Sequence, residues 1–154
     1  MNISRKHVMT VVGLAVCLLT QWVELAAGQP LIIAHRGASG YRPEHTLEAY
    51  TLAITQGADY VEPDLVSTKD GVLICRHECL LTETTDVADK FPERKRSLVI
   101  DGRKVAGWFA LDFTVDEIKM LRIRERLPYR NHKYDGQFQI PTFEEFLTLI
   151  SAEN

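Results

Sequence analysis

Three short apolar runs in the first half of the chain each end in ionisable side chains. The runs cover residues 31–34, 58–64 and 72–75, and the groups at their ends are His35, Glu62, Asp64 and His77. The first run shows no alternation with polar residues, which is typical of a strand covered on both faces. Because parallel strands of a barrel present their carboxyl ends at one edge, the pattern predicts three strands that deliver these groups to a single site.

Three segments with helical spacing of apolar residues follow a threonine that can act as an N-cap. These threonines are Thr46, Thr114 and Thr142. After the second and third, a glutamate stands three residues further on, which is the spacing of a capping box. Gly57 predicts the end of the first helix. A strand followed by a loop and a helix is one βα unit, so the sequence predicts an α/β protein, with residues 78–113 and 128–136 as long loops.

The connection between the second and third predicted strands is too short for a helical crossover. Twelve residues separate Asp64 from His77, and a crossover needs about that many for its helix alone. We therefore expect residues 65–69 to run back as an extended segment. A turn is predicted at Lys69-Asp70-Gly71, before the third strand.

Composition and charge exclude some classes of partner. The 154 residues are 45% hydrophobic and 25% charged, as in an ordinary globular domain. The net charge is -3 and the pI is about 5.9. The protein as a whole therefore does not attract nucleic acid, and we expect no nucleic-acid partner. The oligomeric state is left open.

The N-terminus has the order of features that marks a secretory signal peptide. Arg5 and Lys6 precede an apolar stretch over residues 8–20, and small residues follow. The apolar stretch is shorter than the roughly 20 residues that span a bilayer, so no membrane span is expected in the mature chain. We predict a signal peptide over residues 1–28, secretion, and one domain over residues 29–154. A buried core helix is the alternative interpretation.

Glu62 and Asp64 are the candidate metal ligands. They are two residues apart on a predicted strand, so both carboxylates point to the same face. Close carboxylates repel each other, and a hard cation such as Ca²⁺ or Mg²⁺ removes the repulsion by binding both. The alternative is a pair of solvated acids on an edge strand.

His35, His77 and Arg36 are the candidates for the chemistry itself. Histidine titrates near pH 6.5, so two of them at one edge can supply a base and an acid. A single histidine there would more often be structural. Arg36 suits a phosphate because its planar guanidinium binds oxyanions with two hydrogen bonds, and Gly37 lets the backbone pass close to a ligand.

Two further groups have competing interpretations. Cys75, His77 and Cys79 include ligand types and a spacing that zinc uses, although a disulfide framework is not expected from the two cysteines. The four arginines between residues 122 and 130 either contact a phospholipid head group or form a solvated helix end. The second interpretation is favoured because a basic cluster needs no partner to be stable. These are Arg122, Arg124, Arg126 and Arg130.

Several of these motifs together resemble the glycerophosphodiester phosphodiesterases, and particularly their secreted type. The resemblance runs from about Leu31 to Leu149. The motifs that carry it are His35-Arg36-Gly37, Pro43-Glu44-His45-Thr46, Glu62-Pro63-Asp64 and the strand ending in His77. It implies a TIM-type (β/α) barrel that hydrolyses glycerophosphodiesters, small-molecule substrates, to sn-glycerol 3-phosphate and an alcohol with a divalent cation.

The resemblance also implies roles for individual residues. His35 and His77 match the acid/base pair, Glu62 and Asp64 the metal ligands, and Arg36 a phosphate contact. Glu44 matches a further acidic group near metal or substrate.

The sequence departs from the family pattern at two points. Position 45 is histidine where many members have asparagine. The third carboxylate ligand of the family comes from a later strand than this chain contains, so we expect a partial barrel, its N-terminal half. The competing hypothesis is a truncated, non-catalytic fragment or binding module of the same family.

Overall fold

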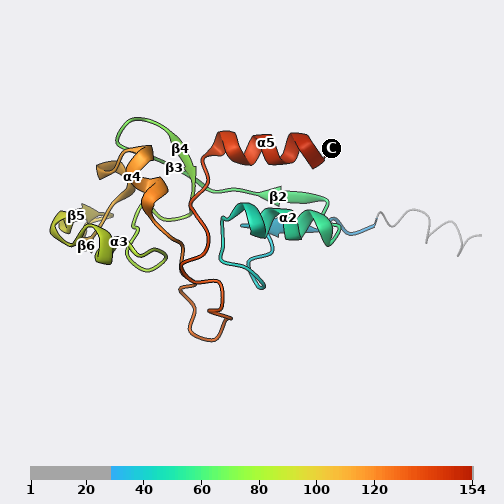
Figure 1. Ribbon diagram of the computed structural model, residues 1–154, viewed down its shortest axis with the longest axis horizontal. Helices are drawn as coiled ribbons and strands as arrows, with labels where there is room; N and C mark the ends of the chain where they lie inside the picture. The colour runs from blue at the N-terminus through green and yellow to red at the C-terminus, as the bar shows by residue number, and fades with distance from the viewer. Residues whose placement is uncertain (1–28, 154) are drawn as a thin grey trace, which may run out of the picture. The chain divides into compact units, whose positions relative to one another are not determined.

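A parallel pair of strands joined through a helix forms the part of the fold that carries the candidate site (Figure 1). In the computed structural model, which describes residues 29–153, β1 (Ile33–His35) pairs in parallel with β2 (Tyr60–Glu62), and α2 (Leu47–Thr55) lies between them in sequence. The register places His35 opposite Glu62. The predicted signal peptide, residues 1–28, lies outside the described residues.

The helix α2 forms where its sequence signals predict. The Thr46 side chain accepts a hydrogen bond from the Ala49 N–H at 3.1 Å, which satisfies one of the free N–H groups at the helix start. Gly57 follows the end of the helix with φ +81°, a left-handed conformation that glycine adopts without strain. The helix buries Ala49, Tyr50 and Ala53, so these three residues face the interior.

The segment after Asp64 runs back as an extended strand, which confirms the expectation for this connection. β3 (Leu65–Ser67) pairs antiparallel with β4 (Leu73–Cys75), and the turn between them contains Gly71 at φ +82°. Just beyond β4, the Arg76 N–H donates to the Asp64 carbonyl at 2.9 Å. The end of β4 is therefore fixed beside Asp64.

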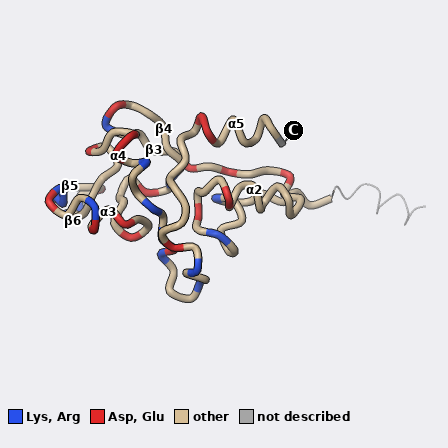
Figure 2. Tube along the Cα trace, in the orientation of Figure 1, with Lys and Arg blue, Asp and Glu red and all other residues tan. Residues whose placement is uncertain are grey.

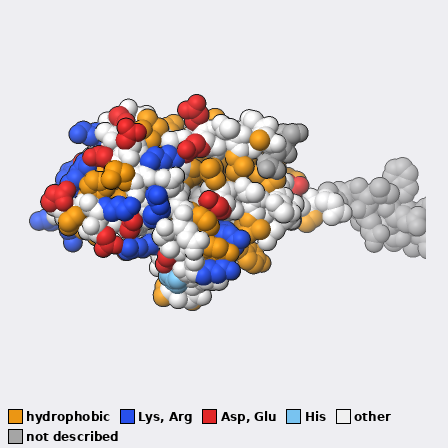
Figure 3. Space-filling model, in the orientation of Figure 1, with side chains coloured by type: hydrophobic (Ala, Val, Ile, Leu, Met, Phe, Trp, Pro, Cys, Tyr) orange, Lys and Arg blue, Asp and Glu red, His pale blue; other side chains and the backbone are white. Residues whose placement is uncertain are grey.

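The prediction that the first strand is covered on both faces is wrong for the described part of the chain. Ile33 and Tyr60 are partners across the parallel pair, and they are 61% and 58% exposed. More than half of each side chain is therefore in contact with solvent. Figure 3 shows hydrophobic side chains reaching the surface over α2 and α5 (Phe143–Glu153).

Residues 78–113, predicted as a loop, contain regular structure. β5 (Arg96–Ile100) and β6 (Arg103–Gly107) form an antiparallel hairpin, closed by Asp101 and Gly102, which both have positive φ. This is the geometry that a tight two-residue hairpin turn requires. The segment also contains α3 (Val87–Lys90) and two 3₁₀ turns, η1 (Pro92–Arg94) and η2 (Ala110–Asp112). Figure 2 marks many Lys, Arg, Asp and Glu positions along this part of the trace.

The two later helices begin at their predicted caps. In α4 (Val115–Met120), Thr114 and Glu117 form both hydrogen bonds of a capping box. Before α5, the Thr142 N–H donates to Glu145 Oε2 at 2.7 Å, and the Glu145 N–H donates to Thr142 Oγ1 at 3.1 Å. Residues 128–136 hold neither helix nor strand, as predicted. No helix within residues 29–153 is long and apolar enough to cross a membrane.

Two groups of buried side chains hold the described residues together. Half of the larger group lies in residues 78–113, predicted as a loop, and Ile74 joins the group to β4. Its other members are Leu81, Val87, Trp108, Ala110, Phe113, Ile118, Leu121, Ile123 and Ile140. The smaller packs α5 on α2, with the Tyr50 and Phe146 rings edge to face at 4.7 Å, and includes Cys75 at the end of β4. Ile74 and Cys75 therefore join β4 to both groups, and the smaller group packs β4 against α2 and α5.

Candidate active site

His35, Glu62 and Asp64 converge at the carboxyl ends of β1 and β2. One ligand atom from each lies within 4.8 Å of the others. His35 Nε2 is 3.7 Å from Glu62 Oε2. The parallel register is the cause, because it places the last residue of β1 beside the last residue of β2, and Asp64 follows two positions later.

This cluster suits a divalent cation. Glu62 Oε2 is buried and has no hydrogen-bond partner among the described residues. A buried carboxylate oxygen without a hydrogen-bond partner is costly, and a cation ligated by the carboxylates would satisfy it. Glu62 and Asp64 are the residues that the sequence singled out as ligands, and the structure brings His35 to the same point.

Arg36 lies between two carboxylates. Its Nη1 donates to both oxygens of Glu44 at 3.2 Å, and its Nε is 3.5 Å from Asp64 Oδ2. The backbone of Arg36 has φ +66°, which is rare for a residue with a side chain and indicates that the surrounding contacts hold it there. These contacts fix the guanidinium beside the cluster of His35, Glu62 and Asp64.

Gly37 is required by its close approach to α2. Its φ is +79°, and a Cβ placed there would lie 2.8 Å from the carbonyl carbon of Ala49. The Ala38 N–H donates to the Ala49 carbonyl at 2.9 Å. The loop that carries Arg36 is therefore packed directly on the helix backbone.

His45 connects the buried interior to Asp64. Its Nε2 is 3.2 Å from Asp64 Oδ2, and its Nδ1 is 2.8 Å from Tyr50 Oη. Burial lowers the pKa of His45 to about 4, so the ring is neutral near pH 7. A carboxylate only accepts hydrogen bonds, so Nε2 carries the proton and Nδ1 accepts from the Tyr50 hydroxyl. Sequence reasoning missed this contact, although the departure from asparagine at position 45 was its signal.

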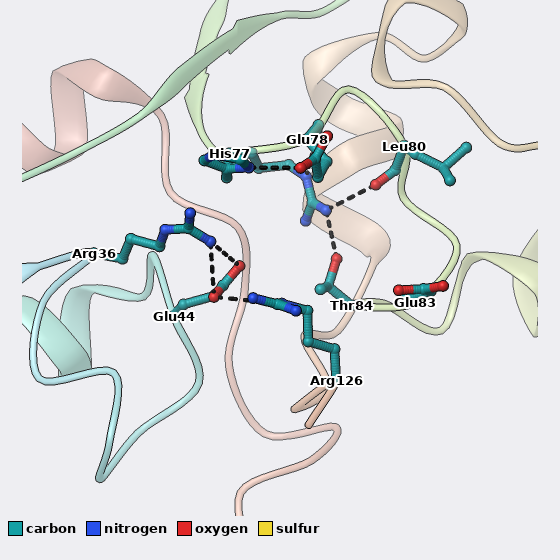
Figure 4. A pocket seen from close by; sticks show the side chains of 9 residues that line it. Arg36, Glu44, His77, Glu78, Leu80, Glu83, Thr84 and Arg126 are labelled. Atoms are coloured by element: carbon teal, nitrogen blue, oxygen red, sulfur yellow. Dashed lines mark hydrogen bonds and ion pairs between the residues drawn. The ribbon is translucent and has the colours of Figure 1, made fainter. Parts of the chain in front are cut away.

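His77 lies after β4 on a turn held by a buried arginine (Figure 4). Arg76 is 5% exposed, and it donates from Nε to the Glu78 carbonyl at 3.3 Å and from Nη2 to the Leu80 carbonyl at 3.1 Å. Nη2 also donates to Thr84 Oγ1 at 2.5 Å. Burial lowers the pKa of Arg76 to about 10, which leaves it charged at neutral pH. His77 itself is exposed, with Nδ1 2.6 Å from Glu78 Oε1.

A cavity of about 270 Å³ adjoins this turn. Arg36, Glu44, His77 and Arg126 are among the side chains that line it. Arg126 Nε lies 3.7 Å from Glu44 Oε2, so Glu44 is paired with Arg36 of its own loop and with Arg126 from a distant segment (Figure 4). Sequence reasoning considered Arg126 only as part of the basic cluster and did not place it in the site.

The other basic residues of that segment have partners within the protein. Arg124 Nη2 is 2.5 Å from Asp89 Oδ2, and Arg130 Nη1 is 3.8 Å from Glu125 Oε2. Arg122 Nη1 donates to the Leu121 carbonyl at 2.8 Å. Each of these three arginines therefore has a partner within the protein.

The zinc interpretation of Cys75, His77 and Cys79 is not supported. The Cys75 thiol is buried and contacts the Thr142 carbonyl at 3.9 Å. Burial raises the pKa of this thiol to about 12. Within residues 29–153, the group of ligand-type side chains that converges is His35, Glu62 and Asp64.

Comparison with known proteins gives a consistent result. Residues 35–154 match the model of the glycerophosphoryl diester phosphodiesterase family. Glycerophosphodiester phosphodiesterase GDPD6 of Arabidopsis thaliana is 46% identical over 127 residues, which are 81% of this chain and 34% of that protein. The glycerophosphodiester phosphodiesterase of Haemophilus influenzae is 44% identical over 133 residues, 79% of this chain and 35% of that protein. The chain spans about a third of the length of these relatives.

Solved structures of such enzymes share the fold. A phosphodiesterase of Oleispira antarctica in complex with the product sn-glycerol-3-phosphate is 31% identical, with a TM-score of 0.57 over 80% of this chain and 41% of the other. A glycerophosphodiester phosphodiesterase of Agrobacterium tumefaciens is 26% identical, with a TM-score of 0.59 over 81% of this chain and 44% of the other.

Proposed function

The chain belongs to the glycerophosphoryl diester phosphodiesterase family, and we propose that the protein hydrolyses glycerophosphodiesters to sn-glycerol 3-phosphate and an alcohol. The observation that carries the proposal is the convergence of His35, Glu62 and Asp64 beside the guanidinium of Arg36. The product-bound Oleispira antarctica phosphodiesterase supports the same substrate class.

Glu62 and Asp64 hold the divalent cation in this proposal, either Ca²⁺ or Mg²⁺, with His35 next to them. The cation, when bound, neutralises negative charge on the phosphate group. Glu44 stays outside the ligand set, because Arg36 and Arg126 both pair with it. Its role is to hold Arg36 in place.

The protein's own side chains bind the substrate and move the protons. Arg36 donates hydrogen bonds to a phosphate oxygen. Its contacts with Glu44 and Asp64 already hold the side chain in position before the substrate binds. One of the two histidines, His35 or His77, removes a proton from the attacking water as the new oxygen–phosphorus bond forms. The other donates a proton to the oxygen of the leaving alcohol as its bond to phosphorus breaks.

The parallel β1–α2–β2 unit is proposed to be part of a TIM-type barrel. The candidate residues lie at the carboxyl ends of its two strands, which is the edge at which such barrels carry their active sites. This position supports the assignment. The order of basic, apolar and small residues over residues 1–28 supports secretion through a signal peptide.

The test is release of sn-glycerol 3-phosphate from glycerophosphocholine by the purified protein. We expect hydrolysis that a chelator abolishes and that added Ca²⁺ or Mg²⁺ restores. His35→Ala should remove the activity, whereas His132→Ala, at an exposed loop position, should keep it. Hydrolysis that survives both the chelator and His35→Ala would overturn the proposal.

A further inference from the structure

The cavity beside His77 has walls from three separate segments of the chain. Arg36 and Glu44 come from the loop after β1, His77 to Thr84 from the turn after β4, and Arg126 from the segment after α4 (Figure 4). Its volume of about 270 Å³ is just below the range of pockets for drug-sized ligands. The cavity therefore has room for one small group of a bound ligand.

Two residues with roles in the proposed reaction line this cavity. The inference therefore rests on the proposed function, which decides which part of the substrate lies there. Arg36 contacts the phosphate, and His77 is one of the two proton-transfer groups. A general acid must reach the oxygen of the leaving alcohol. With His77 as the acid, the alcohol joined to that oxygen extends into the cavity.

The charged groups of the cavity are paired, with one exception. Glu44 is paired with Arg36 and Arg126, and Glu78 contacts His77. Arg76 donates hydrogen bonds to two backbone carbonyl oxygens and to the hydroxyl of Thr84. Glu83 lines the same cavity, yet it forms no hydrogen bond or ion pair with any of residues 29–153.

We propose that this cavity is the subsite for the leaving alcohol and that Glu83 favours alcohols that carry an ammonium group. An unpaired carboxylate attracts a cation, and the side chains of Leu80 and Thr84 on the same wall offer apolar atoms to the carbon atoms around it. Glu83 is then a residue that sets the preference among glycerophosphodiesters, toward those whose alcohol carries an ammonium group.

The experiment compares a cationic and a neutral substrate. The ratio of kcat/KM for glycerophosphoethanolamine to kcat/KM for glycerophosphoglycerol is measured with the unmodified protein and with Glu83→Gln. We expect the substitution to lower this ratio by roughly fivefold, the upper range for an exposed ion pair, and added salt to reduce the difference. Glu93→Gln, an exposed carboxylate of η1 outside the cavity, should leave the ratio unchanged.

The outcomes separate this inference from the proposed function. If both diesters are hydrolysed and Glu83→Gln leaves the ratio unchanged, the enzyme assignment stands and the subsite is wrong. If neither diester is hydrolysed, the proposed function fails, and binding of ethanolamine alone still tests the subsite. Ethanolamine should then shift the amide NMR signals of residues 76–84 in the unmodified protein, and Glu83→Gln should weaken this binding. Equal shifts in both proteins would overturn the proposal.

Discussion

His45 Nε2 lies 3.2 Å from Asp64 Oδ2, and this contact fixes the carboxylate of a candidate metal ligand from the buried side of the site. Tyr50 Oη holds the opposite nitrogen of the ring at 2.8 Å, so the imidazole cannot turn without losing both hydrogen bonds. Groups that orient a metal ligand in this way affect metal affinity although they do not touch the metal.

The first prediction concerns this contact. His45→Ala removes the donor to Asp64, so the affinity for Ca²⁺ or Mg²⁺ should fall by about tenfold, within the usual range for such supporting residues. Isothermal titration with each chloride salt measures it. His45→Asn retains an N–H donor and should lose less affinity. Equal affinity in the alanine variant and the unmodified protein would show that Asp64 does not depend on His45.

The second prediction concerns the packing of Gly37 on α2. In Gly37→Ala the new Cβ meets the Ala49 backbone at 2.8 Å, at a residue whose φ is +79°. We expect the free energy of unfolding to fall by about 3 kcal/mol, from the unfavourable φ and the steric overlap together. Urea unfolding provides the measurement.

Gly57→Ala is the matched control for that substitution. Gly57 has φ +81° but open space around its Cβ position, so only the backbone cost of about 1 kcal/mol applies. Similar losses at the two positions would contradict a steric role for Gly37.

The third prediction concerns Arg76. Arg76→Met leaves the Glu78 and Leu80 carbonyls and the Thr84 hydroxyl without their donor, so the protein should lose about 2 kcal/mol of stability. The turn that follows His77 should also shift, and kcat should fall more than KM changes. Arg124→Met removes only an exposed pair with Asp89 and should cost less than about 1 kcal/mol. A loss of stability without an effect on kcat would restrict Arg76 to a structural role.

The fourth prediction is a pH dependence at His132. Its hydrogen bond to Asp135 raises the pKa above 6.5, with smaller contributions from the Leu127 carbonyl and Glu125. The folded state therefore holds this proton more tightly than the unfolded state. The resulting stabilisation is fully present below pH 6.5 and is lost as the pH rises through the folded-state pKa. An NMR titration of the ring measures the pKa, which Asp135→Asn should lower. An unchanged pKa in that variant would contradict the assignment.

The helices were predictable because their signals are local. Thr46, Thr114 and Thr142 each cap a helix with atoms no more than a few residues away. The hairpin β5–β6 had an equally local signal in Asp101-Gly102, which sequence reasoning overlooked among the charged residues around it. The β5–β6 hairpin was therefore predictable from its turn residues, Asp101 and Gly102.

The contacts within the site were only partly predictable, because they join distant parts of the chain. His35, Glu62 and Asp64 were found since each follows an apolar strand. Arg126 reaches Glu44 from 82 positions further along the sequence, and no local pattern indicates such a pair. The exposure of Ile33 likewise depends on which elements lie over it, and not on its neighbours in sequence.

The last prediction separates stability from metal binding at Glu62. Glu62 Oε2 is buried without a hydrogen-bond partner in the described residues and lies close to Asp64, so the two carboxylates repel each other in the absence of a cation. Glu62→Gln removes this repulsion, and the cation-free protein should gain about 1 kcal/mol in stability. The same substitution removes a ligand charge, so added cation should stabilise the variant less. In the unmodified protein, cation at about a hundred times its Kd adds roughly 2.7 kcal/mol. Thermal unfolding with and without Ca²⁺ or Mg²⁺ measures both effects, and Glu48→Gln on the exposed face of α2 should show neither. A variant that is less stable without cation, or equally stabilised by it, would show that Glu62 is a structural residue rather than a ligand.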